Sequence, residues 1–201
     1  MIYKYETRYI VEFSNKSRAS YSRQRYGPLL ELVTQQAIKE DRKIWNPYII
    51  EDDICHILYY EQKTNSIKDI IVDVEYKDLI YNYYFQLNHN GYPQTRTKGE
   101  KQYLHHIVMG TTQMLDYLNH NPLDNRKENL RVTTPSLNAL NRGFMSNNTS
   151  GTVEVCWIER EQQWRARLIF DGITREEFFH SYEQAVEKRK SWEEEIYKQF
   201  Y

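Results

Sequence analysis

The stretch LDYLNHNPLDNRKENLRVTTPSLNALN, residues 115–141, has the clearest structural pattern in the chain. Its segments MLDYLN, which begins one residue earlier, and NLRVTT have the apolar and β-branched content of short strands. The polar segment HNPLDNRKE joins them, and PSLNALN begins a helix. The stretch therefore predicts two short antiparallel strands followed by a helix.

This arrangement can hold a single divalent cation against a phosphodiester. Such a cation needs hard oxygen ligands, and a carboxylate plus an amide carbonyl suits Mg²⁺ or Mn²⁺. Asp116 at the end of the first strand and Asn138 on the helix have these two side chains. A residue beside the carboxylate, here Tyr117, would activate water. Asn129 on the second strand would fix the connecting loop by hydrogen bonds.

The residues before this stretch predict a mixture of strands and helices. TRYIVEFS alternates like a strand and is followed by a basic turn, SNKSRASYSRQRYG. A helix then has Pro28 in its first turn and apolar residues at helical spacing up to Ile38. IWNPYIIEDD interrupts the pattern. The following segments predict two strands, ICHILYYEQ and IKDIIVDVEY, around the turn KTNS, and a short helix at YKDLIYNYY.

A hairpin and a short histidine-containing segment precede the central stretch. Asn90–Gly91, within FQLNHNGYPQTRTKGEKQY, is the strongest two-residue signal for a hairpin turn. The short segment after it contains His105 and His106.

The polar segment NRGFMSNNTSG, residues 141–151, predicts a domain boundary. Beyond it, TVEVCWIERE, QWRARLIF and GITREEFFH predict three short strands with turns at REQQ and Asp171–Gly172. Ser181 and Gln184 form a capping-box pattern at the start of a last helix. The predicted fold class is α+β, with three parts: an N-terminal segment of unassigned role at residues 1–45, a central domain at 46–145, and a small module of three strands and a helix at 146–201.

Composition places the chain among globular proteins. It has 201 residues, of which 40% are hydrophobic and 27% charged, enough for one well-cored domain or two small ones. No apolar run is long enough to span a bilayer and no secretory segment begins the chain, so we expect a cytoplasmic protein without a membrane partner. Cys55 and Cys156 lack a second pair that would complete a zinc site, which favours buried free thiols.

The charge is unevenly distributed along the chain. The net charge is −1 and the pI is near 6.6, which is unusual for a nucleic-acid-binding protein. Residues 1–45 and 101–150 nevertheless have a basic surplus, and residues 46–100 and 151–201 an acidic one. The 18 tyrosines and 4 tryptophans suit either a β-rich core or stacking platforms for bases.

The run from about Ile70 to Asn141 resembles the HNH endonucleases of phages and mobile introns. IIVDVEYKDLIYNYYFQLNHNGYPQTRTKGEKQYLHHIVM is similar to the segment that leads into their core, and DYLNHNPLDNRKENLRVTT is similar to their strand, loop and strand. The tract NNTSGTVEVCWIEREQQWRARLIFDGI resembles the DNA-binding module, of plant ethylene-response-factor type, that often follows the nuclease. The resemblance implies a ββα-metal nuclease core at residues 46–145.

Carried over to this chain, the resemblance places Asp116 and Asn138 at the metal-ligand positions and Asn129 at the central asparagine of the motif. Tyr117 stands where the family has its general-base histidine. A phenol with a pKa near 10 is almost wholly protonated at pH 7, whereas an imidazole is mostly in its basic form. A bound Mg²⁺ and Arg126, a candidate DNA contact, could lower the pKa of the phenol.

The neighbouring histidines and asparagines have competing interpretations. His105 matches a family histidine and is a candidate catalytic residue, while His106 falls where an arginine is usual. His105 and His120 also fit a structural or phosphate-facing role. Asn125 and Asn129 also fit the simple role of turn residues.

The C-terminal module departs from its family at Glu154, where a glycine is usual, and in REEFFHS, which lacks a leucine and a glycine. Alternate residues on its strands share a face that could enter the major groove. The candidate DNA-binding residues there are Trp157, Arg160, Trp164, Arg165 and Arg167. In the alternative, the tryptophans pack on the helix and the arginines are solvated.

Two functions compete. The first is a metal-dependent HNH-type endonuclease that cuts double-stranded DNA in a bacterial or phage-infected cell, with one Mg²⁺ or Mn²⁺ and with Tyr117 or a neighbouring histidine handling the water. The second is a lapsed nuclease that binds DNA or inhibits a nucleic-acid-targeting protein. The acidic strip at residues 51–53 and the acidic last helix would suit a basic protein partner.

Overall fold

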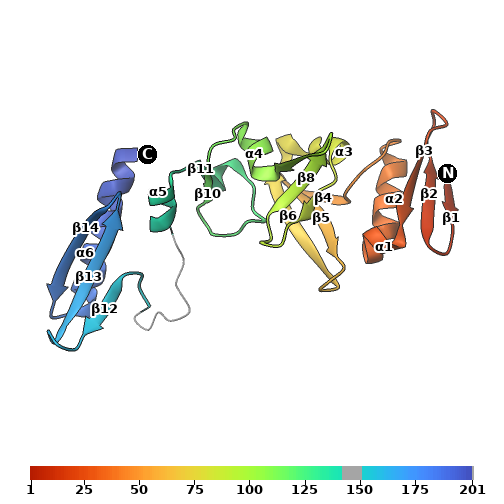
Figure 1. Cartoon of the computed structure of the whole chain (residues 1–201). Coiled ribbons are helices and arrows are strands. Elements are labelled where there is room, and N and C mark those ends of the chain that lie inside the picture. The colour runs from red at the N-terminus through yellow and green to blue at the C-terminus, as the bar shows by residue number, and fades with distance from the viewer. Residues whose placement is uncertain (142–150, 201) are drawn as a thin grey trace. The chain divides into compact units, whose positions relative to one another are not determined.

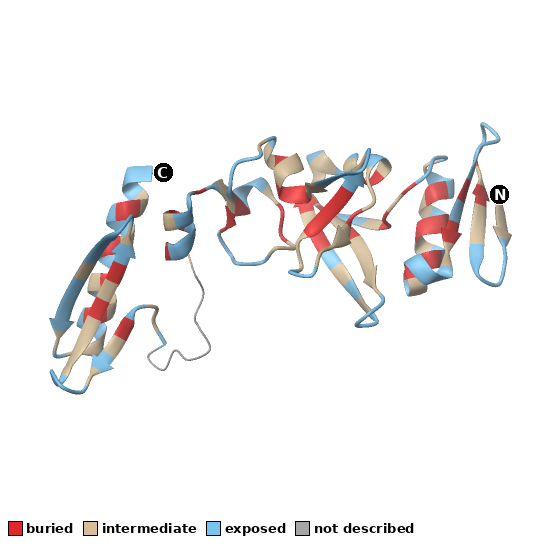
Figure 2. Cartoon of the chain, in the orientation of Figure 1, coloured by how far each residue is buried: buried red, intermediate tan, exposed pale blue. Residues whose placement is uncertain are grey.

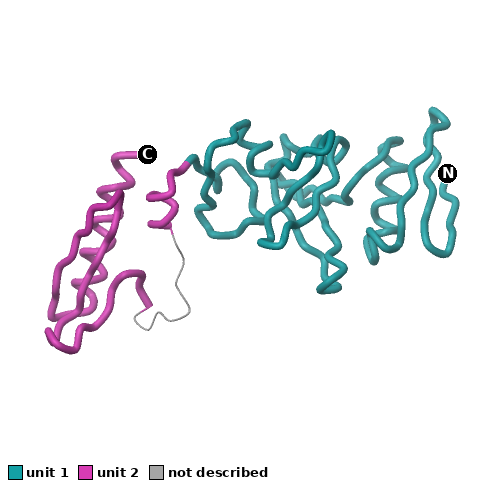
Figure 3. Tube along the Cα trace, in the orientation of Figure 1, with its two compact units in different colours: residues 1–132 teal, residues 133–201 magenta. Residues whose placement is uncertain are grey.

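The computed structural model describes residues 1–141 and 151–200 (Figure 1). The chain forms two compact units, residues 1–132 and 133–201, coloured separately in Figure 3. The predicted boundary segment lies almost wholly outside the described residues, and the three predicted domains stay a prediction. Several small sheets and short helices make up the chain, which confirms the α+β class.

A three-stranded sheet and a helix begin the first unit. The antiparallel strands, in the sheet order β1-β2-β3, are β1 (Ile2–Lys4), β2 (Arg8–Glu12) and β3 (Arg18–Ser22). The helical elements that follow are α1 (Arg23–Tyr26), the 3₁₀ turn η1 (Gly27–Leu29) and α2 (Leu30–Lys39). Helix α2 is the helix predicted after Pro28.

The basic segment predicted as a turn instead contains β3 and α1. Ala19 and Tyr21 are buried at alternate positions of β3, in one core with Val33 of α2. Arg18 and Ser20 occupy the outward positions and are exposed. Only two apolar residues therefore mark the strand, and the alternation is too short to distinguish it from a polar turn.

The central part of the first unit contains two further small sheets. The first has the order β4-β5-β6 and comprises β4 (Tyr48–Glu51), β5 (Ile54–Glu61) and β6 (Ser66–Asp73). The second has the order β7-β8-β9 and comprises β7 (Gln86–Leu87), β8 (Pro93–Thr97) and β9 (Glu100–Tyr103). The helical elements are η2 (Val74–Tyr76), α3 (Leu79–Asn82) and α4 (Leu104–Met109). Strands β5 and β6, helix α3 and the turn at Asn90–Gly91 confirm the predictions, whereas β4 was missed.

The core of this part anchors the predicted strand pair. Strands β10 (Leu115–Tyr117) and β11 (Leu130–Val132) are antiparallel, as predicted. Tyr117 and Leu130, which are register partners, are buried in one hydrophobic cluster with Ile57, Ile70 and Phe85. The site residues on β10 are therefore held by the same core as β5 and β6.

The N-terminal sheet and α2 also join this central part. Tyr48 and Tyr81 pack against both hydrophobic clusters of the first unit. The Tyr48 hydroxyl donates to Glu40 Oε1 at 2.9 Å, and the Tyr81 hydroxyl donates to Glu40 Oε2 at 3.2 Å. The Tyr26 hydroxyl donates to the Trp45 carbonyl at 2.9 Å. The hydrogen bonds of Tyr48 and Tyr81 to Glu40 therefore tie residues 1–45 to the central part, whereas the Tyr26 bond lies within residues 1–45.

The second unit begins with α5 (Pro135–Leu140). Thr134 caps the start of this helix, because its side chain accepts a hydrogen bond from the Leu137 amide. Its sheet, in the order β12-β13-β14, comprises β12 (Val155–Ile158), β13 (Gln163–Phe170) and β14 (Ile173–Phe179), and the last helix is α6 (Tyr182–Phe200). Buried residues line β13 and α6 (Figure 2). The three strands and the helix confirm the predicted architecture of the module.

The predictions for the cysteines and for membrane-spanning segments can also be compared with the structure. Cys55 and Cys156 are free; the first is buried and the second half-buried. Within the described residues, none of the helices has the length and apolar content required to cross a bilayer.

Candidate active site

The strand pair β10 and β11 places a carboxylate opposite a guanidinium. Asp116 and Arg131 are register partners, and Arg131 Nη2 and Nε donate to Asp116 Oδ2 at 2.8 and 3.1 Å. Only 7% of Asp116 is exposed. The predicted metal ligand is therefore a buried carboxylate that already has a cationic partner.

The loop between the two strands is fixed by Asn129. The Asn129 side chain is buried, accepts a hydrogen bond from the Asn119 amide at 3.0 Å and donates to the Asp124 carbonyl at 2.8 Å. The Leu118 amide donates to the Asn129 carbonyl at 2.9 Å, which closes the loop at its base. These are the loop-fixing hydrogen bonds expected of this asparagine.

Arg126, the candidate DNA contact in this loop, is held by two carboxylates. Its Nε and Nη2 donate to Asp124 at 2.8 and 2.7 Å, and its Nη1 donates to Glu128 at 2.5 Å. Burial raises the pKa of the Asp124 carboxyl, but the hydrogen bonds and charge of Arg126 outweigh it and place that pKa below its ordinary value. A phosphate would have to compete with both carboxylates for Arg126.

The loop is also attached to strand β6. The Ile71 amide donates to the Leu123 carbonyl, and the Asn125 amide donates to the Ile71 carbonyl, both at 2.8 Å. The Lys127 amide donates to Asp73 Oδ2 at 2.9 Å. Because the loop is bonded to the sheet at several points, its side chains are presented by a rigid support.

Tyr117 lies in a buried chain of hydrogen bonds. Its hydroxyl is 2.8 Å from His105 Nδ1 and 2.9 Å from Asn125 Oδ1, to which it can donate. His105 lies on α4, next to Tyr103 and His106, whose rings have centroids 5.3 and 4.4 Å from the imidazole centroid. The structure therefore brings together two of the predicted catalytic residues, Tyr117 and His105.

Burial keeps both of these groups uncharged at neutral pH. Desolvation, with smaller contributions from Tyr92 and Asp124, raises the pKa of the Tyr117 phenol well above its ordinary value. Desolvation, followed by the charge of His106, lowers the pKa of His105 to about 4. Arg126, which we expected to favour the phenolate, is instead engaged by Asp124 and Glu128. A neutral phenol thus faces a neutral imidazole.

Asn138 is exposed on α5, in the second unit, while Asp116 belongs to the first. The apolar side of α5 places Leu137 and Leu140 in the core of the C-terminal sheet and helix. The convergence of Asp116 and Asn138 on one cation therefore stays a prediction. Among the described residues, no group of three or more His, Cys, Asp and Glu side chains could hold a metal.

The five candidate DNA-binding residues of the module occupy three separate places. Trp157 and Trp164 are register partners with ring centroids 5.6 Å apart, and Trp164 packs against Tyr182 of α6 at 4.9 Å. Arg165 and Arg167 lie at odd spacings from Trp164 along β13. Because successive side chains of a strand point to opposite faces, both arginines lie on the face opposite Trp164. They are half-buried there. Arg160 is exposed in the turn before β13 and pairs with Glu161 at 2.7 Å.

Acidic residues offset the arginines on this outer face. Arg165 Nη1 lies 3.7 Å from Glu176 Oε2, and Glu176 is the register partner of Arg167. The two tryptophans and the two strand arginines therefore cannot act on one surface, and the arginine face has little surplus charge. DNA binding by this module stays a prediction.

Sequence reasoning did not single out Arg131, and it assigned Asn125 only a turn role. The available signal for Arg131 was the register of the two strands. When these short strands pair antiparallel, Arg131 lies directly across from Asp116. The contact of Asn125 with Tyr117 depends on how the loop folds back on β6, for which the sequence has no local signal.

Two curated proteins are similar to this chain. An uncharacterized HNH endonuclease of Acanthamoeba polyphaga mimivirus is 28% identical over 131 residues, which is 61% of this chain and 67% of that protein. Protein 3.8 of Escherichia phage T7 is 31% identical over 58 residues, which is 29% of this chain and 48% of that protein. No protein-family model matches the chain, and no solved structure matches it.

These distant similarities support a relationship to the HNH class. The matched region covers less than half of the T7 protein. The ethylene-response-factor resemblance of the C-terminal module is without support from the comparisons.

Proposed function

We propose that this protein is a metal-dependent DNA endonuclease of HNH type, in which Tyr117 and His105 together replace the single general-base histidine. The observation that carries the proposal is the 2.8 Å contact between the Tyr117 hydroxyl and His105 Nδ1. Tyr117 follows Asp116 in β10, within the strand pair expected of this class, and His105 reaches it from α4. The distant HNH endonuclease of mimivirus supports the same reaction class.

The two predicted ligands are of the kinds that a hard divalent cation favours. Asp116 would supply carboxylate oxygens and Asn138 an amide carbonyl, which are ligands that Mg²⁺ and Mn²⁺ favour. When bound, such an ion would supply positive charge at the scissile phosphate. Arg131 holds one Asp116 oxygen in the structure, and its guanidinium would compete with the ion or move to a phosphate oxygen.

The buried pair provides a route for the proton of the attacking water. The phenol proton can turn from Asn125 Oδ1 to His105 Nδ1 without moving a heavy atom, because both acceptors lie within 2.9 Å. As a water proton reaches the Tyr117 oxygen, the phenol proton passes to His105 Nδ1. The resulting hydroxide attacks phosphorus, and the bond from phosphorus to the leaving oxygen breaks, with the leaving oxygen taking a proton from solvent water. Tyr117 is then restored as a phenol and His105 carries the proton.

The second candidate function is a lapsed nuclease that binds DNA or a basic protein. The observation in its favour is the buried ion pair of Asp116 and Arg131, because the guanidinium satisfies the carboxylate without a metal. The acidic residues 51–53 are exposed at the end of β4 and in the turn to β5, where a basic partner could reach them.

Nicking of supercoiled plasmid by the full chain separates these functions. We expect wild type to nick with Mn²⁺ or Mg²⁺ and not with EDTA, and Asp116→Ala to lose the activity. Asp69→Asn is a matched control, since it also removes a paired carboxylate, whose partner is His56 at 2.8 Å, but lies outside the site. DNA binding without nicking under any metal condition would reject the endonuclease and support the lapsed form.

A further inference from the structure

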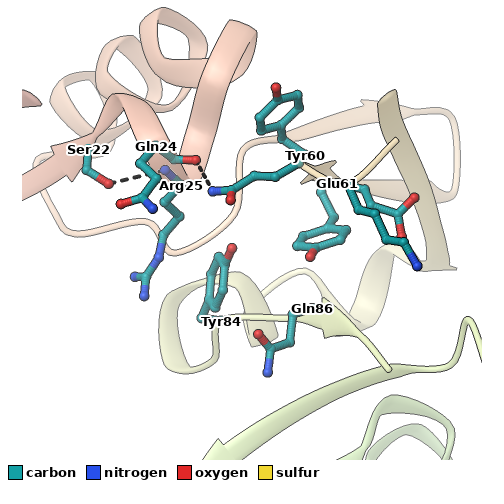
Figure 4. Close-up of a pocket in the computed structure, with 10 residues that line it drawn as sticks. Ser22, Gln24, Arg25, Tyr60, Glu61, Tyr84 and Gln86 are labelled. Carbon is teal, nitrogen blue, oxygen red and sulfur yellow. Dashed lines mark hydrogen bonds between the residues drawn. The ribbon is translucent and has the colours of Figure 1, made fainter. Parts of the chain in front are cut away.

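A hollow lies between the N-terminal sheet and the β5–β6 hairpin of the first unit (Figure 4). Its volume is about 580 Å³, within the range of small-molecule sites. The residues that line it come from the end of β3 and α1, from the end of β5, and from the segment before and into β7. The nuclease site described above uses none of them.

Two tyrosine rings and one guanidinium form part of its wall. Arg25 lies over the ring of Tyr84, with its guanidinium carbon 4.4 Å from the ring centroid (Figure 4). Tyr59 lines the same hollow. Tyr60 is committed elsewhere, because its ring packs against Gly27, where an added Cβ would approach the ring to 2.5 Å. The remaining rings that line the hollow are Tyr84, which has Arg25 over its ring, and Tyr59, which also packs against the central core.

The hollow has a surplus of positive charge. Arg25 and Lys63 line it, and neither has a carboxylate partner among the described residues. The carboxylate in the wall, Glu61, is 3.6 Å from Lys68 and accepts a hydrogen bond from Thr64. Anionic groups are thus attracted to the Arg25 side of the hollow.

Two further arginines extend this positive charge outside the hollow, as a basic strip along the end of the N-terminal sheet. Arg23 follows Ser22 in the chain, and Arg8 is the register partner of Ser22. Both arginines are exposed and lack a carboxylate partner in the part of the chain that the structure describes. A chain of phosphates could follow this strip on either side of the hollow.

Amide side chains complete the lining. Gln24 and Gln86 line the hollow, and amides can both donate to and accept from the edge of a base. Aromatic faces for stacking, cations for the backbone and amides for base edges are the combination that binds single-stranded nucleic acid. A paired base cannot enter such a hollow without leaving its duplex stack.

We propose that this hollow binds an unpaired nucleotide of a DNA strand, with the base against Tyr84 and Tyr59 and the phosphate at Arg25 and Lys63. The choice of DNA rests on the proposed nuclease function. The hollow lies at the tip of the β5–β6 hairpin, whereas the loop of the proposed nuclease site is bonded to Ile71 and Asp73 near the other end of β6. It would hold an unpaired stretch of strand away from the cleavage site, and it would act in binding whether or not the chain cuts.

The test measures binding of the full chain in EDTA, so that no cleavage occurs. The probes are a fluorescein-labelled single strand of DNA, the same sequence as a blunt duplex, and the RNA counterpart. Tyr84→Leu should weaken single-strand DNA binding by roughly 5- to 100-fold, the range for loss of one stacking ring. Arg25→Gln should lower the slope of log affinity against log salt by about 0.7.

Arg42→Gln is the matched control, because its guanidinium also lies over a tyrosine ring, that of Tyr81 at 3.8 Å, but does not line the hollow. It should bind like wild type. If Tyr84→Leu loses its fold by circular dichroism, Arg25→Gln and Lys63→Gln decide the result. Unchanged single-strand DNA binding by these variants, an equal loss in Arg42→Gln, or a loss confined to the RNA or the duplex would overturn the proposal. None of these results depends on nicking, so failure here is distinct from failure of the nuclease function.

Discussion

Burial leaves Tyr117 and His105 poorly tuned for the proton transfer that we propose. For the relay to work, His105 must accept a proton, yet its pKa is about 4. At pH 7 the free energy of protonating a base with that pKa is about 4 kcal/mol less favourable than for a base tuned to neutral pH. We therefore expect DNA cleavage to be slower, by up to about a thousand-fold, than in an enzyme whose histidine is tuned to neutral pH.

The buried histidine should make the stability of the chain depend on pH. The pKa of His105 falls from its ordinary 6.5 to about 4 on folding, so the unfolded state binds the proton more tightly. Its contribution to stability is fully present above pH 6.5 and is lost as the pH falls towards 4. The shift corresponds to about 3 kcal/mol.

His105→Asn removes the titration and keeps a polar atom near the position of Nδ1. We expect the stability difference between wild type and this variant to shrink as the pH falls from 7 to 4.5, measured by thermal unfolding in matched buffers. Parallel curves for the two proteins over that range would show that His105 is not buried in its neutral form.

At the level of single residues, the sequence placed the strand residues and missed their partners. Asp116 and Tyr117 lie on the predicted first strand, whereas Asn129, predicted on the second strand, ends the 3₁₀ turn just before it and makes the loop hydrogen bonds from there. The pairing of Asp116 with Arg131 and the contact of Tyr117 with His105 join residues that are distant along the chain. Such contacts depend on register and packing, which composition does not specify.

The connecting loop is the element that gives the site its rigidity. Asn129 fills its centre with two buried hydrogen bonds, and Asp124 and Asn125 tie it to Arg126 and β6. Side chains placed by such a loop lose little freedom when a substrate binds.

Asn129→Ala should loosen this loop without unfolding the first unit. The Asn119 amide and the Asp124 carbonyl would lose their partner, a cost of about 1–3 kcal/mol. Amide exchange in residues 118–129, followed by mass spectrometry, should then accelerate by roughly ten-fold or more.

Asn121→Ala is the comparison for this variant. It removes an exposed asparagine that accepts a hydrogen bond from the Leu123 amide at 3.1 Å in the same loop. Its exchange should stay near that of wild type. Equal acceleration in both variants would show that Asn129 has no special part in holding the loop.

The elements that the sequence missed are short and carry polar residues on one face. Strand β3 has only Ala19 and Tyr21 inward, and β4 has no buried residue, with Ile49 and Ile50 exposed. The elements predicted well, such as β5, β6, β13 and α6, are longer and have a full apolar face. Periodicity is informative only over several repeats, which explains the difference.

At the scale of the whole molecule, α5 belongs to a different compact unit from the strands that precede it in the predicted nuclease motif. Its residues Leu137 and Leu140 are buried in the core of the C-terminal sheet and helix. We therefore expect residues 133–201 to fold alone and the predicted module at 146–201 to be less stable. The loss should be about 2 kcal/mol or more, since burying a leucine in a core contributes that much.

Urea unfolding of the two fragments, followed by tryptophan fluorescence, measures this difference. Leu137→Ala in the longer fragment should reproduce part of the loss. If residues 146–201 were as stable as residues 133–201, α5 would not be part of the C-terminal core.

The central claim, that Tyr117 and His105 act together in DNA cleavage, is tested most directly by plasmid nicking with wild type, Tyr117→Phe and Tyr117→His in Mn²⁺. Phenylalanine keeps the buried ring and removes the hydroxyl that joins water to His105, so DNA affinity should stay within about two-fold. We expect Tyr117→Phe to nick at least about a hundred-fold more slowly, because this is the usual contribution of a positioned proton acceptor. Tyr117→His should retain activity. Nicking by Tyr117→Phe at the rate of wild type would contradict the claim.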